Sequence, residues 1–261
     1  MSERTVDWTA LRPRAGEPKA EGLRERKKRL MRQQLSDTAT EMFMERGFDA
    51  VRVSEIAEAC GVSEKTVFNY FPTKESLILD RWESTTPALR AALAEPGLTP
   101  VEAVLRILSD ELGGITSWLA GQEDPARGRA MIMRFGTLTR STPSLRAHHR
   151  DMADRLVAVA AELLAERAGM APNDPEPQIT AVALLGLWDV QAQSLRKHLD
   201  SADAPARLHA AVTADVHRAA ELIKTGVGSF EGWRQRAQTP LPRDPDSYPQ
   251  GKPGGGEEEP E

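Results

Sequence analysis

Apolar residues recur along the chain at the spacing of an α-helix. Over residues 23–46 they stand three or four positions apart, which predicts a helix with one apolar face. Gly47 follows directly and is well placed as the C-terminal cap of that helix. The residues that define the apolar face are Leu35, Ala39, Met42 and Phe43.

Two shorter helical segments come next, over residues 54–60 and 64–71, and Pro72 ends the second. The turn between them is Gly61-Val62-Ser63. Two helices joined by a short turn that contains Gly form a helix-turn-helix, whose second helix enters the major groove of DNA. The residues expected to face inward and hold the two helices together are Val53, Ile56, Ala57, Val62, Val67 and Phe71.

A helix-start signal recurs through the rest of the chain. At Thr99-Pro100-Val101-Glu102, an N-cap residue precedes Pro at the first helical position and Glu at the third. Thr73 is the expected N-cap of a helix over 74–93. Similar starts at Asp124, Thr142, Asp174 and, more weakly, Ala204 complete a set of predicted helices: 100–119, 125–140, 143–168, 175–199 and 205–225. Because no strand-like alternation interrupts them, we predict an all-α protein of about nine helices.

Polar stretches mark both ends of the chain. Residues 1–22 show no helical period and are expected to form a flexible N-terminal arm. Residues 239–261 are rich in Pro and Gly and end in acidic residues, so we expect a disordered tail. Between them, Pro96-Gly97 divides the helical part into residues 23–93, which contain the helix-turn-helix and the linking helix 74–93, and residues 97–230.

The composition is that of a globular protein. Hydrophobic residues make up 40% of the 261 positions, and the apolar runs are far shorter than the ~18 residues of a membrane span. The N-terminus lacks the apolar core of a secretory signal. The single cysteine, Cys60, cannot form an internal disulfide and is expected to be buried among apolar neighbours. These features predict a cytoplasmic location and no association with a membrane.

The net charge of −5 argues against DNA binding until its distribution is considered. Residues 21–34 hold six Lys and Arg residues against two Glu, whereas the last five residues hold four acids. Local charge governs attraction to phosphate. We therefore interpret the basic run, with Arg26, Lys27 and Lys28, as an extension that follows the DNA backbone; the alternative is an ordinary solvated face.

The outward face of the second short helix carries side chains that can read bases. Lys donates to guanine and Asn pairs with adenine, so Lys65 and Asn69 are the expected base readers. The alternative is that these polar side chains are only solvated. Packing is the expected role of Phe68, and Glu64 is the weaker candidate because it would repel phosphate.

A second group of residues is expected near the DNA phosphates. Tyr70 and Lys74 are the expected direct contacts, since Lys74 combines a cation with a predicted helix N-terminus. Ser54, Ser63 and Thr66 are expected to cap helices and to present hydroxyls or amides near phosphate.

Over this region the chain resembles the TetR family of one-component transcriptional regulators. The matching residues are Gly47-Phe48, then Val53-x-x-Ile56-Ala57-x-Ala59-x-Gly61-Val62-Ser63, then Thr66-Val67-Phe68-x-Tyr70-Phe71-Pro72-x-Lys74-Glu75-x-Leu77. Cys60 departs from the usual Ala of the family, and Lys65 stands where many members have Gly.

This resemblance implies a homodimeric repressor that a small apolar or amphipathic effector releases from a palindromic operator in double-stranded DNA. The last two helices would pair with their copies in a four-helix bundle, so residues 97–230 would serve dimerisation and effector binding. The segment 134–147 is similar to a subgroup with acyl-CoA-like ligands, in which Arg134 or Arg146 would meet an anionic head group. Candidate ligand contacts between the fifth and eighth helices are Trp82, Trp118, Met131, Arg134, Phe135 and Trp188.

Other classes of function have weaker support. Adjacent His148 and His149 would diverge on a helix and share a metal poorly, and we expect no metal, no cofactor and no enzymatic activity. One alternative is a sequence-independent DNA-organising protein that uses the basic run. Another is a helical carrier or enzyme with a vestigial helix-turn-helix.

Overall fold

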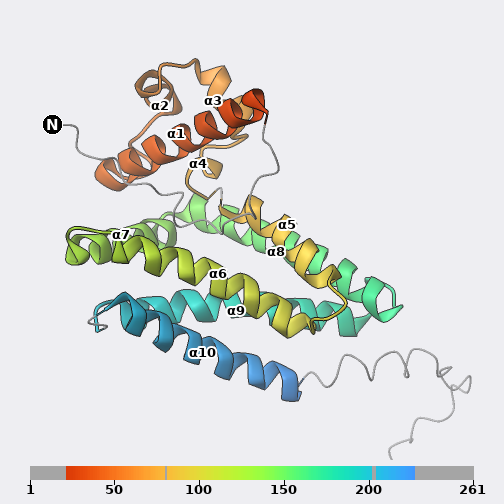
Figure 1. Cartoon of the computed structure of the whole chain (residues 1–261). Helices are drawn as coiled ribbons and strands as arrows, with labels where there is room; N and C mark the ends of the chain where they lie inside the picture. The colour runs from red at the N-terminus through yellow and green to blue at the C-terminus, as the bar shows by residue number, and fades with distance from the viewer. Residues whose placement is uncertain (1–21, 80, 202–203, 227–261) are drawn as a thin grey trace, which may run out of the picture.

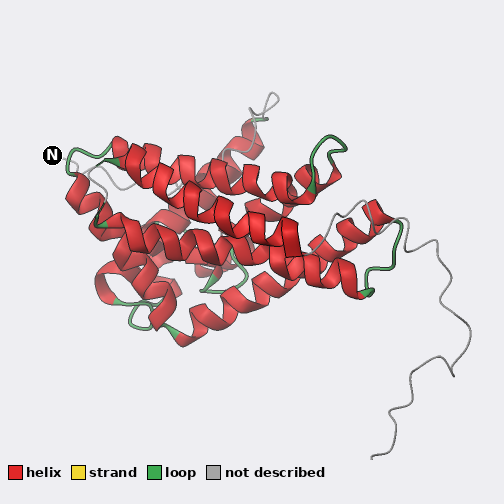
Figure 2. Ribbon diagram, turned by 90° about the horizontal axis from the view of Figure 1, so that it is seen from below, coloured by secondary structure: helices red, strands yellow, loops and turns green. Residues whose placement is uncertain are grey.

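In the computed structural model, residues 22–79, 81–201 and 204–226 are described, and side chains 81–84 and 226 are left out of that description. Within these ranges, loops join ten helices and no strand is present (Figures 1 and 2). The predicted all-α fold is therefore confirmed. The predicted arm and tail, 1–22 and 239–261, lie outside the described residues apart from Gly22.

The helices follow the predicted order closely. Their bounds are α1 Leu23–Arg46, α2 Val53–Ala59, α3 Glu64–Tyr70, α4 Ser76–Leu79, α5 Arg81–Ala94, α6 Pro100–Ala120, α7 Pro125–Ser141, α8 Pro143–Ala168, α9 Pro175–Leu199 and α10 Pro205–Gly226. The Thr99 hydroxyl and the Glu102 carboxylate form the expected capping box at the start of α6. Gly47 ends α1 with φ 88°, a value that disfavours any residue other than glycine.

Within the region predicted as one helix over 74–93, the structure describes α4 and α5, and residue 80 between them lies outside the described residues. Thr73 does cap the first turn, since its hydroxyl accepts the Ser76 N–H at 3.2 Å. The Leu77 carbonyl accepts the Ser36 hydroxyl at 2.9 Å, so α1 holds α4 in place.

Two apolar clusters form the core. The first joins α1 to α4, and the expected inward residues belong to it: Val53, Ile56, Ala57, Val67 and Phe71 are buried and Val62 is half-buried. The second joins α5, α6, α8, α9 and α10. Leu145 of α8 is buried in the first cluster, while Phe135 and Leu138 of α7 pack against both. The part of the molecule formed by α1 to α4 therefore rests directly on α7 and α8 (Figure 1).

Candidate nucleic-acid interface and ligand cavity

The helix-turn-helix is built by α2, α3 and the turn between them. Gly61 takes φ 67°, the left-handed conformation that lets the chain reverse between the two helices. Ser63 caps α3, because its hydroxyl accepts the Thr66 N–H at 3.1 Å and lies 2.8 Å from the Thr66 hydroxyl. The predicted cap role of Ser54 is wrong. It is the second residue of α2, where Glu55 accepts the Arg52 N–H at 2.7 Å.

Arg32 of α1 fixes the other end of α3. Its guanidinium donates to the Tyr70 carbonyl at 2.6 Å and lies 4.5 Å from the centre of the Phe71 ring. A cation at a helix C-terminus also complements the helix dipole. Val67, in the middle of α3, is fully buried in the core. The helix is therefore held at both ends by hydrogen bonds and along its inner face by packing.

The outward face of α3 is accessible. Lys65 and Asn69 are exposed, Thr66 is half-buried, and Tyr70 is half-buried with its ring against the core. Phe68 is 44% exposed on this outward face. An exposed aromatic ring can make apolar contact with a thymine methyl group.

Lys74 lies beneath the helix-turn-helix and is half-buried. Its ammonium donates to the Phe48 carbonyl at 2.6 Å. It also stands 4.4 Å from the centre of the Phe48 ring and 5.5 Å from that of Phe43. Burial lowers the pKa of Lys74, and the acids Asp49 and Glu75 oppose that shift. These contacts give the residue a structural role that the sequence did not predict.

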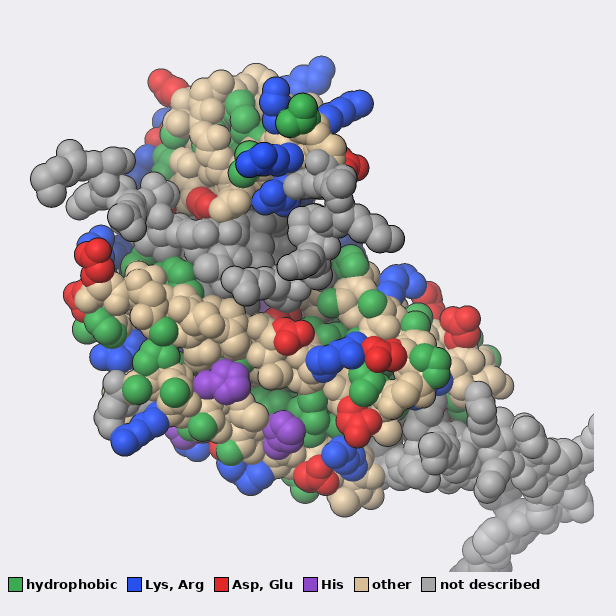
Figure 3. All heavy atoms as spheres, in the orientation of Figure 1, with side chains coloured by type: hydrophobic (Ala, Val, Ile, Leu, Met, Phe, Trp, Pro, Cys, Tyr) green, Lys and Arg blue, Asp and Glu red, His purple; other side chains and the backbone are tan. Residues whose placement is uncertain are grey.

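The basic beginning of α1 lies at the same end of the DNA-binding part as the C-terminus of α3, as the Arg32 contact requires (Figure 1). Arg26, Lys27 and Lys28 are exposed there. Figure 3 shows Lys and Arg side chains gathered on this end of the molecule. Ser54, in α2, is also exposed.

A cavity of about 400 Å³ lies where α4 and α5 meet α6, α7, α8 and α9. Of the predicted ligand contacts, Phe135 and Trp188 line it. Three others are absent from its described lining. Trp118 is buried in the second core cluster, Met131 packs against that cluster, and Arg134 is exposed on α7. The side chain of Trp82 lies outside the described residues.

Several cavity residues were missed by the sequence prediction. The buried Glu111 of α6 accepts the Trp188 indole N–H at 3.1 Å and the Thr85 hydroxyl at 3.4 Å. Arg146, named as a possible head-group contact, does line the cavity. Further basic residues in the lining are Arg140, His149, Arg150 and Arg196. In the sequence, the spacing of Arg146 and Arg150, one helical turn apart, already indicated that both side chains lie on the same face of a helix.

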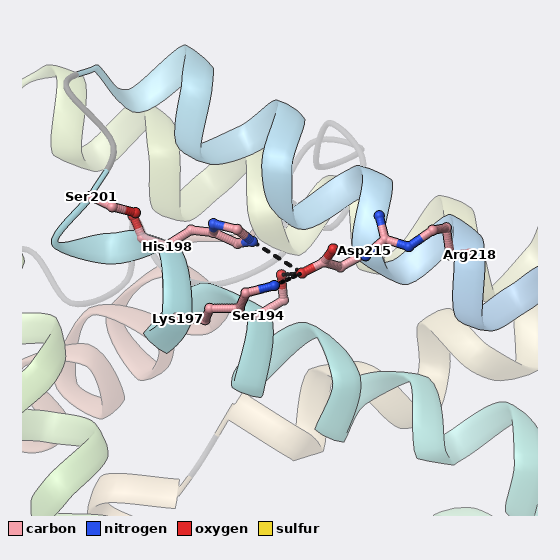
Figure 4. Close-up of polar contacts among 6 residues, drawn as sticks. All are labelled: Ser194, Lys197, His198, Ser201, Asp215 and Arg218. Atoms are coloured by element: carbon pink, nitrogen blue, oxygen red, sulfur yellow. Dashed lines mark hydrogen bonds and ion pairs between the residues drawn. The ribbon is translucent and has the colours of Figure 1, made fainter.

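A polar cluster joins α9 to α10 around Asp215 (Figure 4). One oxygen of its carboxylate accepts the Ser194 hydroxyl at 2.8 Å and lies 3.0 Å from His198 Nε2. Lys197 stands at 3.6 Å and Arg218 pairs with the other oxygen. These hydrogen bonds hold the pKa of Asp215 well below its usual range. The Ser194 hydroxyl donates to the carboxylate, so the cluster fixes the two helices together.

The described residues lack two features of other classes of protein. No group of three or more His, Cys, Asp or Glu side chains in this part of the chain is arranged to hold a metal ion. None of its helices combines the length and apolarity needed to cross a membrane.

The sequence and the structure resemble known proteins. Residues 35–80 match the family model for bacterial regulatory proteins of the tetR family, and residues 120–224 match the model for the MftR C-terminal domain. The transcriptional regulator TcmR of Streptomyces glaucescens is 31% identical over 159 residues, which cover 60% of this chain and 69% of TcmR. MftR of Mycobacterium tuberculosis is 25% identical over 153 residues, covering 59% and 73%.

A solved TetR-family regulator of Streptomyces coelicolor aligns with 81% of this chain and 90% of its own at 22% identity. Its TM-score of 0.39 is too low to support detailed comparison. The fold and the helix-turn-helix define a DNA-binding transcriptional regulator and not an enzyme. The chain belongs to the TetR family.

Proposed function

We propose that the protein is a cytoplasmic, homodimeric repressor that binds a pseudo-palindromic operator in double-stranded DNA. A small apolar or amphipathic effector in the cavity releases it. The strongest support is the outward face of α3, where Lys65 and Asn69 are exposed on a helix held at both ends. Ser54, Ser63, Thr66, Tyr70, Lys74 and the basic start of α1, with Arg26, Lys27 and Lys28, would then contact phosphates.

Selection of binding sites from random DNA tests the first part of this proposal. We expect a two-fold symmetric site whose half-sites lie one helical turn or a multiple apart. Asn69→Ala should cost about 1–3 kcal/mol and relax the preference at one base position. Asn173→Ala, the same change at an exposed loop residue far along the chain, is the control. Equal affinity for random and selected DNA would instead favour the sequence-independent alternative.

The dimer is supported by an apolar stripe exposed on α9 and α10. Ile179, Val182 and Leu222 are 58%, 53% and 73% exposed. Gly186 lies on the same face as Ile179 and Val182, and a Cβ added to it would meet nothing within 4 Å. A two-fold interface is also what a palindromic site requires. Ile179→Asp should yield monomers in analytical ultracentrifugation, whereas Leu30→Asp, at an exposed apolar position of α1, should not.

Release is supported by the contacts between the cavity and the DNA-binding part. Ile78 and Leu79 of α4 line the cavity, and Ser36 joins α4 to α1. Arg32 then joins α1 to the end of α3. An effector acts only if it binds the released state more tightly, and couplings of about 1–3 kcal/mol are usual. By reciprocity, operator DNA must weaken the effector equally. A ligand with the same affinity in the presence and absence of operator is not the effector.

A further inference from the structure

The cavity has an apolar interior and a charged mouth. Its buried lining contains the apolar side chains of Ile78, Leu79, Ile115 and Trp188, together with the polar Thr85, Glu111 and Gln191. The side chains that line it and remain exposed include Arg140, Arg146 and Arg150. With the half-buried Arg196, four arginines stand against two acids, Glu111 and Asp189, an excess of two positive charges.

The arginines come from three helices that converge on the mouth. Arg146 and Arg150 are one turn apart on α8 and therefore share a face. The Arg140 guanidinium of α7 lies against Gly136, where an added Cβ would come within 2.9 Å of it. Burial lowers the pKa of Arg140, and the nearby charge of Arg196 on α9 lowers it further. The mouth therefore concentrates like charges, which an external anion can balance.

Glu111 is poorly placed to neutralise these arginines. Glu111 is only 6% exposed, and its two carboxylate oxygens already accept hydrogen bonds from Thr85 and Trp188. Burial lowers the pKa of His149, the only histidine of the described lining, and Asp189 on α9 partly opposes that shift. The buried end of the cavity is thus satisfied internally, whereas the mouth keeps its positive charge.

We propose that the cavity binds an amphipathic anion, with its apolar body among α4, α6 and α9 and its carboxylate or phosphate group at Arg140, Arg146 and Arg150. A guanidinium donates paired hydrogen bonds to such oxyanions. The volume of about 400 Å³ suits a drug-sized molecule. This inference rests on the proposed function and deepens it, because it assigns a charge class to the effector.

Four ligands with the same ten-carbon chain test the charge class. Decanoate, decyl phosphate, decanol and decyltrimethylammonium are titrated calorimetrically into the full-length protein without DNA, below the concentrations at which they form micelles. We expect the better anion to bind about tenfold or more tightly than decanol, and the cation to bind weakest. The two anions separate carboxylate from phosphate recognition. Equal affinity for decanol, tightest binding of the cation, or no binding of either anion would overturn the inference.

Substitutions locate the binding site. Arg140→Gln and Arg150→Gln should weaken anion binding about ten- to hundredfold and leave decanol binding nearly unchanged. Arg134→Gln, on the same helix as Arg140 but outside the described lining, is the matched control. Its effect should stay within about twofold, as for an ordinary surface charge. An equal loss in the control would mean diffuse surface attraction and would also overturn the inference.

The outcome is separable from that of the proposed function. The titrations contain no operator, so a failure of DNA binding would leave them unaffected. Conversely, release of the protein from its operator by decanol but by neither anion would preserve the proposed function and overturn the anionic class of effector.

Discussion

Replacing Lys74 with Met tests whether this lysine stabilises the DNA-binding part. Its ammonium donates to the Phe48 carbonyl at 2.6 Å and stands over the Phe48 and Phe43 rings at 4.4 and 5.5 Å. The two rings are buried and their centres lie 4.8 Å apart. Lys74 therefore connects the segment after α1 to the segment after α3.

The expected loss of stability follows from these contacts. A hydrogen bond from a charged donor contributes about 1.5–3 kcal/mol, and a cation near an aromatic face adds about 0.5–1 kcal/mol at a partly exposed site. The desolvation that lowers the pKa of Lys74 offsets part of this gain. Met retains most of the apolar stem. We expect a net loss of about 1–3 kcal/mol, which corresponds to a fall in Tm of roughly 2–12 °C for a protein of this size.

Thermal unfolding and DNA binding at several salt concentrations distinguish the two roles of Lys74. A phosphate contact alone would leave Tm unchanged and reduce the slope of log K against log salt by about one. The structural role lowers Tm, and a combined role changes both quantities. Lys65→Met, at an exposed position of α3, is the control and should leave Tm unchanged. A Tm for Lys74→Met within about 1 °C of the wild type would refute the structural reasoning.

Three further predictions follow from other contacts. Arg32→Lys keeps the charge but loses the planar group on Phe71, so DNA affinity and stability should each fall by about 1 kcal/mol, measured by fluorescence anisotropy and denaturant unfolding; unchanged values would refute the clamp. Asp215→Asn should lower Tm at pH 7. Hydrogen bonds lower the pKa of Asp215, so its contribution to folding stability is lost as pH falls below 3.8, the ordinary pKa of an Asp. The difference in Tm between the variant and the wild type should therefore shrink below that pH. Burial lowers the pKa of His149, so the wild type should lose stability as pH falls below the ordinary value of 6.5, and His149→Gln should lose less between pH 7 and 5.

The helix bounds were predictable wherever the deciding signal is local. Pro143 starts α8, and Gly169, with φ 69°, ends it at the predicted residue. Thr99 and Glu102 satisfy the first amides of α6 within four residues of sequence. Such signals act through the hydrogen bonds of a single turn, so they can be recognised in the sequence without knowledge of the fold.

Contacts between residues far apart in the sequence could not be predicted in this way. The bond from Arg32 to Tyr70 spans 38 positions and that from Ser36 to Leu77 spans 41. Two tryptophans show the same limit in the ligand cavity. Trp118 and Trp188 are both buried on long helices, yet only Trp188 is part of the cavity lining. Which side of a helix faces a cavity depends on how neighbouring helices pack, and the spacing of apolar residues cannot report it.

The contacts of α4 determine the expected route of release. All four residues of α4 are buried, and two of them, Ile78 and Leu79, line the cavity. We therefore expect a ligand to act by moving α4 against Ser36, with α1 passing the displacement to α3 through Arg32. Ser36→Ala should then reduce the coupling between effector and operator while leaving each separate affinity nearly unchanged. Full coupling in that variant would assign the transmission to the packing of Leu145, Phe135 and Leu138 on the first core cluster.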